Sequence, residues 1–591
     1  MRTVFSSSAI PEGFNKGHIL SLRWKRRIKR VAIIGILLIP LAWIAFLGAD
    51  YLARTPRERK LARIGYWDQI IYGARFNAIY AWNWLTAEQD DPKGSALPVM
   101  ELYIRTERLK ALKAHLPESG RIYQPGLFKV RRKGEPNSVL GANLRFRGDS
   151  MNHWAFPQKS WRVKLKRGSR YLGMRQFNLY LPRTKSQIPD FLGYRLAENM
   201  GGLEVPKAFP IHLRVNRQFD GVRVFLEQVN EDFFLNHNLS ADRLFVGDID
   251  FKDVYAYHDR EFLFESVKGW EVVPTKKGGD TSVAPMQALL EVLPIAANEP
   301  ERFKTAIEKV LDVQTTLRYM AYLEIVGSIH ADETHNQRYF FDLRTQKLKP
   351  IVWDPVAYYR EKIDGIDFAP NGLFQALLQI PEYREEKNRC VWEAIHGALS
   401  PGRVAQLITD SANSVRKEIL ASPQKVYTFQ ANLHMMPNSE WESSVHELVE
   451  KSRARSEVLR SALRKISISA ESKGSHGGVE DVHIMVGADA GFEARELVFD
   501  STGSVPTSVG VEEDGAAKRI LCVPVEKGGC VARFDRFLSS KRRVDKNDDL
   551  IRESRPYRWS IRTGSSSLRL RFIRGVNTIT KEPHGVEVKR G

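Results

Sequence analysis

The stretch HADETHNQRYFFDLRTQKLKPIVWDP, residues 330–355, contains residue types that can support phosphoryl transfer. Asp332 and Asn336 lie near its start with three residues between them, and Asp354 lies near its end. Phosphoryl transfer requires a carboxylate that receives the proton of the attacking hydroxyl, and an amide oxygen and a second carboxylate that hold magnesium on the phosphates. The three side chains supply the two carboxylates and the amide of such a site.

The elements expected around this stretch would bring the three side chains together. A helix over residues 313–331, capped by Asp312, leads ADETHN into a loop. QRYFFDL and LKPIVWD then predict a hairpin, and paired strands lie about 5 Å apart. Asp354, at the end of the second strand, is therefore expected beside the loop. Protein kinases place an Asp, four residues, an Asn, a hairpin and a metal-binding Asp in a similar order.

Two other interpretations of this stretch stay open. Asp332 and Asn336 are residue types that commonly end helices and form turns, so their role can be structural. His330 and His335 with Asp332 also fit a metal-dependent hydrolase, although no second ligand cluster at zinc-type spacing accompanies them. Elsewhere, the basic turn RTKS, residues 183–186, is either a phosphate or acidic-substrate site or a solvated loop.

The segment upstream of the stretch predicts a β-rich region followed by helices. Runs of alternating or apolar residues separated by turns predict six strands, and DFLGYRLAENMGG predicts a helix that stops at glycine. Residues 284–330 and 374–465 have helical patterns. The predicted strands are GLFKVRRKG, ANLRFRG, KSWRVKL, FNLYLP, AFPIHLRVN and GVRVFLEQV.

Several separated blocks in this region resemble the spore coat protein H (CotH) kinase-like family, an atypical branch of the protein kinase fold. The resemblance covers residues 100–360. It rests on LRFRGDSMNHWAFPQKSWRVKL, DFLGYRLAENMGG, VNRQFDGVRVFLEQVNEDFF, DETHNQRYFF and IVWDP, in that order. It implies an ATP-dependent phosphotransferase that uses Mg²⁺ or Mn²⁺.

The resemblance also implies a role for each matching residue. Groups expected to contact the nucleotide are Lys159, its orienting partner Glu227, and Arg147. Asp332 matches the catalytic acid, and Asn336 and Asp354 match the metal ligands. This chain departs from the family where Pro355 and Val356 follow Asp354, since the family usually has a further Asp or Gly there. That departure favours an alternative, an inactive pseudokinase that acts as an envelope binding or assembly protein.

The N-terminal residues predict a membrane anchor. Residues 31–50 contain nineteen successive positions without charge, enough to cross about 30 Å of hydrocarbon as a helix. The basic cluster WKRRIKR before them predicts a cytoplasmic tail and C-terminal domains outside the inner membrane. A cleavable signal peptide is the alternative. In the juxtamembrane segment, YWDQIIYGARFNAIYAWNWL predicts an amphipathic, partly interfacial helix.

The C-terminal part predicts a separate small β domain after a linker rich in small residues. Cys522 and Cys530 flank PVEKGG between two short strands, a placement compatible with a disulfide, and Cys390 lies in a helical stretch as a buried thiol. The predicted order is a basic tail (1–30), transmembrane helix (31–50), juxtamembrane segment (51–95), CotH-like kinase domain (96–465), linker (466–477) and β-rich domain (478–591).

The composition of the chain limits the classes of binding partner that are expected. The chain of 591 residues has 90 Lys and Arg against 70 Asp and Glu, a net charge of +20. Such a balance favours an anionic membrane surface or an acidic or phosphate-rich substrate. No zinc-finger spacing or RNA-binding aromatic signature is present, so no nucleic-acid partner is expected. The sequence thus predicts an α+β, single-pass kinase of the cell envelope that acts on a protein or envelope-polymer hydroxyl.

Overall fold

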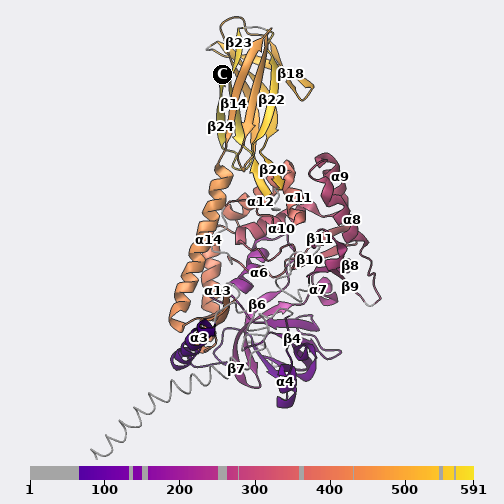
Figure 1. Cartoon of the computed structure of the whole chain (residues 1–591), viewed down its shortest axis with the longest axis vertical. Coiled ribbons are helices and arrows are strands. Elements are labelled where there is room, and N and C mark those ends of the chain that lie inside the picture. The colour runs from indigo at the N-terminus through magenta and orange to yellow at the C-terminus, as the bar shows by residue number, and fades with distance from the viewer. Residues whose placement is uncertain are drawn as a thin grey trace, which may run out of the picture.

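The computed structural model describes residues 66–116, 118–131, 138–148, 158–249, 262–276, 278–358, 365–429, 432–526, 528–544, 550–564 and 567–590. In this part the chain is mixed α+β and forms three tiers along its long axis (Figure 1). A closed barrel lies at one end, a helical lobe with a small sheet lies in the middle, and a second closed barrel lies at the other end. The α+β class predicted from the sequence is confirmed.

The N-terminal barrel consists of strands in the order β1-β2-β3-β4-β5-β7-β6, closed by parallel pairing of β6 with β1. Along β4, Trp161, Val163 and Leu165 point into the core, whereas Arg162 and Lys164 point outward, as strand alternation requires. All six predicted strands of this region are present. The strands are β1 (Val99–Tyr103), β2 (Gln124–Arg131), β3 (Ser138–Phe146), β4 (Trp161–Leu165), β5 (Gln176–Tyr180), β6 (Ala208–Val215) and β7 (Gln218–Glu227).

The middle lobe is built from helices around a buried four-stranded sheet of order β11-β10-β8-β9. Asp312 caps α10 by accepting from the Thr315 amide at 3.0 Å, as predicted, and the predicted hairpin forms as β10 and β11. The sheet strands are β8 (Ala241–Gly247), β9 (Trp270–Pro274), β10 (Gln337–Asp342) and β11 (Lys347–Pro350), and a separate hairpin is β12 (Val426–Phe429) with β13 (Asn432–Met435).

The described helices are α3 (Tyr66–Thr86), α4 (Thr106–Lys113), α6 (Pro189–Met200), α7 (Glu231–Asn236), α8 (Ala284–Val292), α9 (Pro300–Val310), α10 (Val313–Val326), α11 (Gly372–Gln379), α12 (Pro381–His396), α13 (Pro401–Ala421) and α14 (Trp441–Arg464). The helical patterns predicted for 284–330 and 374–465 are thereby confirmed. The exception is the β12–β13 hairpin, which interrupts the second range between α13 and α14.

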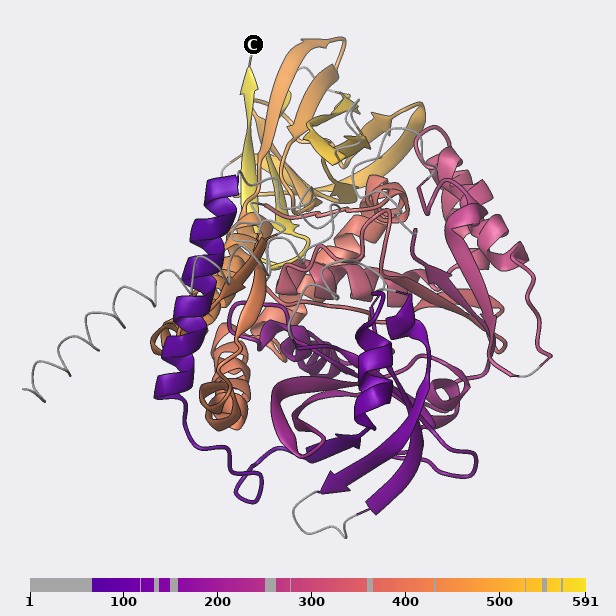
Figure 2. The ribbon, with the colours of Figure 1, turned by 60° about the horizontal axis from the view of Figure 1, so that its bottom comes forward.

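Helix α3 is the predicted juxtamembrane helix, and one of its faces packs against the protein. The buried Asn83 side chain donates to the carbonyls of Pro423 (3.1 Å) and Met436 (2.9 Å) and accepts from the Asn438 amide (2.8 Å). Figure 2 shows α3, in indigo, beside the orange helices that precede the C-terminal barrel. In the residues described, no helix is long and apolar enough to cross a membrane. The span predicted at 31–50 lies outside the described residues.

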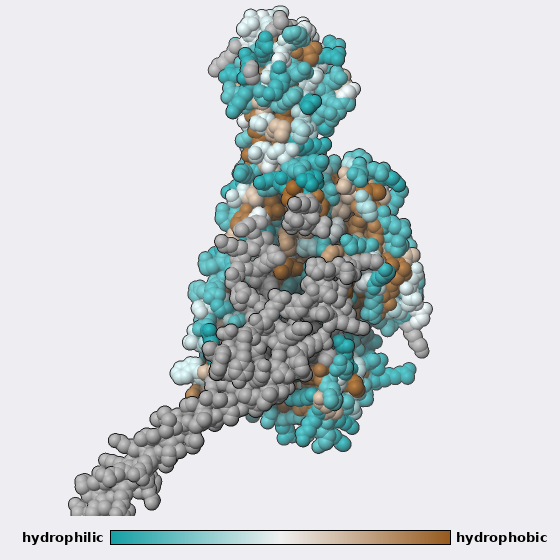
Figure 3. Space-filling view, viewed as in Figure 1, coloured by the Kyte–Doolittle hydropathy of each residue, from teal (hydrophilic) through white to brown (hydrophobic). Residues whose placement is uncertain are grey.

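The C-terminal domain is a nine-stranded closed barrel of order β14-β15-β22-β17-β18-β19-β16-β23-β24. Its outer surface is mostly hydrophilic in the view of Figure 3. Cys522 and Cys530 form the disulfide that the hairpin pattern allowed. The strands are β14 (Ile468–His476), β15 (Val479–Val486), β16 (Phe492–Ser501), β17 (Ser508–Glu513), β18 (Ala516–Pro524), β19 (Gly529–Leu538), β22 (Arg555–Arg562), β23 (Leu568–Asn577) and β24 (Pro583–Arg590), with β20 (Lys541–Val544) and β21 (Leu550–Glu553) as a separate hairpin.

The prediction of a linker at 466–477 was wrong, because most of that segment is strand β14. Ala470 and Ser472 are buried, so two of the small residues that resembled a linker occupy inward-facing barrel positions. β14 pairs with β15 and, in parallel, with β24 from the end of the chain. The barrel therefore begins only a few residues after α14 ends at Arg464.

Candidate active site

Two arginines and a histidine, which form a cationic cluster, surround Asp354 in the region between the N-terminal barrel and the helical lobe. Arg147 follows β3, Arg183 follows β5, and His330 follows α10, while Asp354 follows β11. The Nδ1 of His330 lies 3.1 Å from Asp354 Oδ2, and the Nη2 of Arg183 lies 3.9 Å from the same oxygen. Arg147 lies close enough for its charge to act on Asp354. Four segments that are distant in sequence thus meet at one carboxylate.

The charge state of Asp354 reflects this environment. Burial raises its pKa, but the His330 hydrogen bond and the charges of His330, Arg183 and Arg147 outweigh burial and hold the pKa of Asp354 well below its usual range. The carboxylate is therefore ionised at neutral pH. Carboxylates with strongly shifted pKa values beside specific charged partners are typical of functional sites.

Arg147 has an unused hydrogen-bond donor beside this carboxylate. Its guanidinium stacks over the Tyr180 ring, with 5.6 Å from Cζ to the ring centre. Its Nε is buried and has no acceptor among the described residues. A buried guanidinium N–H without a partner is costly unless a ligand supplies the acceptor. Anionic oxygens, such as those of a phosphate, are the acceptors that arginine binds best.

The backbone at Asp354 adopts a left-handed conformation, with φ of 48°. Non-glycine residues in this region cost about 1–3 kcal/mol and concentrate at functional sites. Asp354 is held there from α6, because its amide donates to the Tyr194 hydroxyl at 3.1 Å. Tyr194 was quoted in the family block DFLGYRLAENMGG but received no role from the sequence.

Asp332, the expected catalytic carboxylate, lies in a tight turn. Its Oδ1 accepts from the Thr334 amide (2.7 Å), the Thr334 hydroxyl (2.8 Å) and the His335 amide (2.9 Å). The His335 Nδ1 also lies 3.1 Å from Oδ1 and 3.2 Å from Oδ2. The structural and the catalytic interpretations therefore apply to the same side chain: Asp332 shapes the loop, and its carboxylate stays more than one-third exposed.

We expect His335 to stay protonated above the pH at which histidine usually loses its proton. Burial lowers the pKa of His335, but Asp332, with Asp248 and Asp354, raises it overall. The ion pair is thus complete below the usual histidine pKa of 6.5 and is lost as pH rises through the higher folded value. Histidine-selective NMR titration, assigned with His335→Gln, measures the midpoint. A midpoint at or below 6.5, or one that Asp332→Asn does not lower, contradicts this prediction.

The structure does not pair Lys159 with Glu227. Both Glu227 oxygens are engaged elsewhere, by Asn236 (3.1 Å), His237 (2.9 Å) and the Lys207 amide (3.0 Å). No Lys159–Glu227 ion pair is found among the described residues, and the charge of Lys159 acts on Asp220 instead. The nucleotide-binding roles of Lys159 and Glu227 stay predictions without support from their geometry. His237 binds Glu227, but no sequence motif around His237 indicated this contact.

Asn336 and its neighbours complete the loop beside Asp332. The Asn336 backbone, with φ of 60°, donates to Asp248 Oδ1 at 2.8 Å, and Arg338 binds the other Asp248 oxygen at 2.5 Å. Across the described residues, no group of three or more His, Cys, Asp or Glu side chains is arranged to hold a metal ion. His330 and His335 bind different carboxylates, so the histidine-based hydrolase has no support from this geometry.

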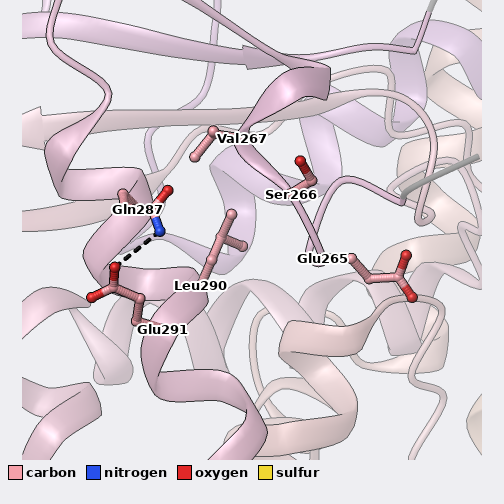
Figure 4. Close-up of a pocket in the computed structure, with 6 residues that line it drawn as sticks. All are labelled: Glu265, Ser266, Val267, Gln287, Leu290 and Glu291. Carbon is pink, nitrogen blue, oxygen red and sulfur yellow. Dashed lines mark hydrogen bonds between the residues drawn. The ribbon is translucent and has the colours of Figure 1, made fainter.

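A hollow among the described residues lies apart from the site residues. It measures about 300 Å³ and lies beside α8, with Gln287 donating to Glu291 at 2.9 Å across its rim (Figure 4). Its lining is acidic and contains none of the predicted site residues. The lining residues are Glu265, Ser266, Val267, Gln287, Leu290 and Glu291. It does not compete with the cationic cluster as a phosphate site.

Comparison with known proteins agrees with the resemblance seen in the sequence. The CotH kinase protein family model matches residues 144–459, more than half of the 591 residues. All six predicted site residues and the cationic cluster around Asp354 fall within the match. No curated protein matches the sequence. The chain therefore belongs to the CotH kinase protein family.

Proposed function

We propose that this protein is an atypical kinase that transfers phosphate from a nucleotide to a hydroxyl of a protein or envelope polymer. The observation that carries the proposal is the convergence of Arg147, Arg183 and His330 on Asp354 inside the family-matched region. Kinase chemistry depends mainly on positioning and on charge stabilisation of the phosphates. The cationic cluster beside the ionised Asp354 carboxylate provides both the positioning and the charge stabilisation.

The residues present fit a bound nucleotide. The unpartnered Nε of Arg147 supplies a buried donor for a phosphate oxygen, and Arg183 supplies a second guanidinium. Asp354 and the Asn336 amide would hold Mg²⁺ or Mn²⁺, whose preferred ligands are oxygens of this type. When bound, the ion would neutralise the charge of the phosphates. Lys159 keeps the phosphate-contact role that the resemblance implies.

Asp332 is the proposed proton acceptor. Its Oδ2 makes one described contact, with His335, and so remains available to the hydroxyl of a substrate. The hydrogen bonds to Oδ1 fix the direction of the carboxylate. Because burial raises the pKa of Asp332 but His335 and Thr334 lower it overall, the group is ionised at neutral pH and can accept a proton.

A second candidate function is a pseudokinase that binds an envelope component. Asp332 already accepts several hydrogen bonds within its own turn, and Pro355 and Val356 stand where the family usually has a further Asp or Gly. These features favour a loop that is stable without substrate. In this case the protein binds nucleotide or polymer and transfers no phosphate.

The decisive experiment incubates the purified full-length chain with γ-labelled ATP and either Mg²⁺ or Mn²⁺. We expect label to appear on the chain or on an added envelope fraction only when the divalent ion is present. A thermal shift with ATP, measured alongside, reports nucleotide binding separately. Binding without transfer supports the pseudokinase, and the absence of both contradicts nucleotide use altogether.

We further propose that the kinase is anchored in the inner membrane by residues 31–50, with its folded domains outside. Apolar side chains at the end of α3 support contact with a membrane surface. Trp82, Trp84 and Leu85 are 56%, 65% and 69% exposed, although the intervening Asn83 is fully buried. Tryptophan is enriched where the bilayer meets water. The mostly hydrophilic C-terminal barrel lies at the opposite end of the molecule from the N-terminal barrel (Figures 1 and 3).

In proteoliposomes, we expect lipids brominated near the headgroup to quench part of the tryptophan fluorescence. The Trp82→Phe/Trp84→Phe variant should lose most of that quenched component, because these rings lie at the interface. Trp392→Phe, on α12, is the matched control and should leave it unchanged. Equal quenching in the parent and the double variant means that the end of α3 does not contact lipid.

A further inference from the structure

The β20–β21 hairpin, which connects β19 and β22 of the C-terminal barrel, inserts a buried arginine into the helical lobe. Arg542 lies on β20 and is 3% exposed. Its Nη2 and Nε donate to Asp367 Oδ2 at 2.6 and 3.0 Å, and its Nη2 also donates to Asp489 at 2.8 Å. Figure 1 places β20 beside α11 and α12, below the barrel. Arg542 lies beyond residues 144–459, so the family match does not include it.

Asp367 is the centre of a buried charge network within the helical lobe. Its other oxygen accepts from Lys387 at 2.6 Å, and Lys387 also donates to Glu324 of α10 at 2.5 Å. The Asp367 amide donates to Glu324 at 2.8 Å, and its φ is 68°. Buried charges are stable only when they are paired, so the arrangement fixes the backbone at Asp367.

The segment that carries Asp367 contacts the loop with the proposed catalytic carboxylate. Asn371, fully buried four residues further on, donates its side-chain amide to the Ala331 carbonyl at 3.0 Å. Ala331 is the residue before Asp332. Arg455 of α14 holds the other end of the segment through the Gly365 carbonyl at 2.7 Å. A continuous path therefore runs from Arg542 through Asp367 and Asn371 to the position of Asp332.

We infer that Arg542 is a positioning residue for the transfer reaction, and that the C-terminal barrel is part of the catalytic unit. Arg542 fixes segment 365–371, and this segment fixes the loop that carries Asp332. The kinetic part of this inference rests on the proposed kinase function. The structural part does not, because it concerns contacts between the barrel and the loop.

The test compares Arg542→Ala, Arg542→Lys and Arg543→Ala in the full-length chain. Arg543 is the matched control: it is the next residue of the same strand, its side chain is 51% exposed, and it binds Glu553 at 2.8 Å within the hairpin. Hydrogen exchange measured by mass spectrometry reports on 365–371, on 326–335 and on β15. The β15 strand shows whether the barrel itself remains folded.

We expect Arg542→Ala to increase exchange about tenfold in 365–371 and 326–335, with β15 and the Arg543→Ala chain unchanged. The turnover number should fall about tenfold to a hundredfold, because the loop that carries Asp332 is displaced. Arg542→Lys, which keeps the charge, should recover part of the loss.

The inference is overturned if exchange in 326–335 is unaffected, or if Arg543→Ala has the same effect. It is also overturned if exchange increases but the turnover number does not fall in a chain that transfers phosphate. If the parent chain transfers no phosphate, the proposed function fails, and the exchange pattern alone then decides whether the barrel positions the loop.

Discussion

Replacing Asp354 with asparagine is expected to lower phosphate transfer by about a thousandfold, the scale typical when a preorganised charge is lost from an active site. The substitution keeps the size of the side chain and removes its negative charge. A divalent ion would lose its carboxylate ligand, and Arg147, Arg183 and His330 would lose the anion around which they gather. Transfer of label from γ-labelled ATP, at saturating Mn²⁺, measures the effect.

The same variant separates loss of chemistry from loss of structure. Without the Asp354 charge, the guanidinium groups of Arg147 and Arg183 have no opposing carboxylate at this position, so metal-free ATP should bind at least as tightly as to the parent chain. Asp410→Asn, at an exposed position of α13, is the matched control and should retain full activity. Undiminished transfer by Asp354→Asn would remove this carboxylate from the mechanism and favour the pseudokinase.

Replacing Lys387 with methionine is expected to cost about 3–5 kcal/mol of stability in the helical lobe, because it leaves buried carboxylates without a counter-charge. The Lys387 ammonium is completely buried and contacts both Glu324 and Asp367. Hydrogen exchange of α10 and α12 amides measures the free energy of opening. Adding Glu324→Gln to Lys387→Met should restore part of the loss, since one unpaired carboxylate is then neutral.

A partly exposed lysine provides the comparison for Lys387. Lys304, on α9, is 25% exposed and lies 3.4 Å from Glu382 and 3.8 Å from Glu301. Surface pairs of this kind contribute less than about 1 kcal/mol, so Lys304→Met should barely change exchange. Equal effects of the two lysine substitutions would mean that the buried network does not stabilise the lobe.

Individual helices and strands were predictable from the sequence because the residue patterns that specify them lie within each segment. Alternating apolar residues fixed the positions of β2 to β7, and the Asp312 cap marked the start of α10. The hairpin from 337 to 350 placed Asp354 near the loop of Asp332, and the charge of each acts on His335. The closure of the two barrels was not predictable. Closure depends on the pairing of β6 with β1 and of β24 with β14, and the sequence of an individual strand does not indicate which other strand it pairs with.

The roles predicted for the site residues stay predictions, although Arg147 and Asp354 do lie together. Glu227 was predicted to orient Lys159, whereas its contacts are with Asn236 of α7 and with the residue after it, His237, because a strand pattern does not reveal which helix covers its end. The positioning role of Arg542 could not be predicted from the sequence. The arginines of a basic barrel have similar sequence surroundings, and only the structure shows which of them is buried against another domain.

Helix α14 gives the molecule a direct mechanical connection between its two ends. It has 24 residues and is therefore about 36 Å long. It begins just after the segment that binds Asn83 of α3, and it ends four residues before Ile468, where β14 starts. Tension applied between α3 and the C-terminal barrel would be carried along this edge, by one helix under axial strain. The loop around Asp332 is coupled to this helix, because Arg455 of α14 binds the Gly365 carbonyl and Asn371 of the same segment binds the Ala331 carbonyl, so we expect strain along α14 to reach the site through these two contacts.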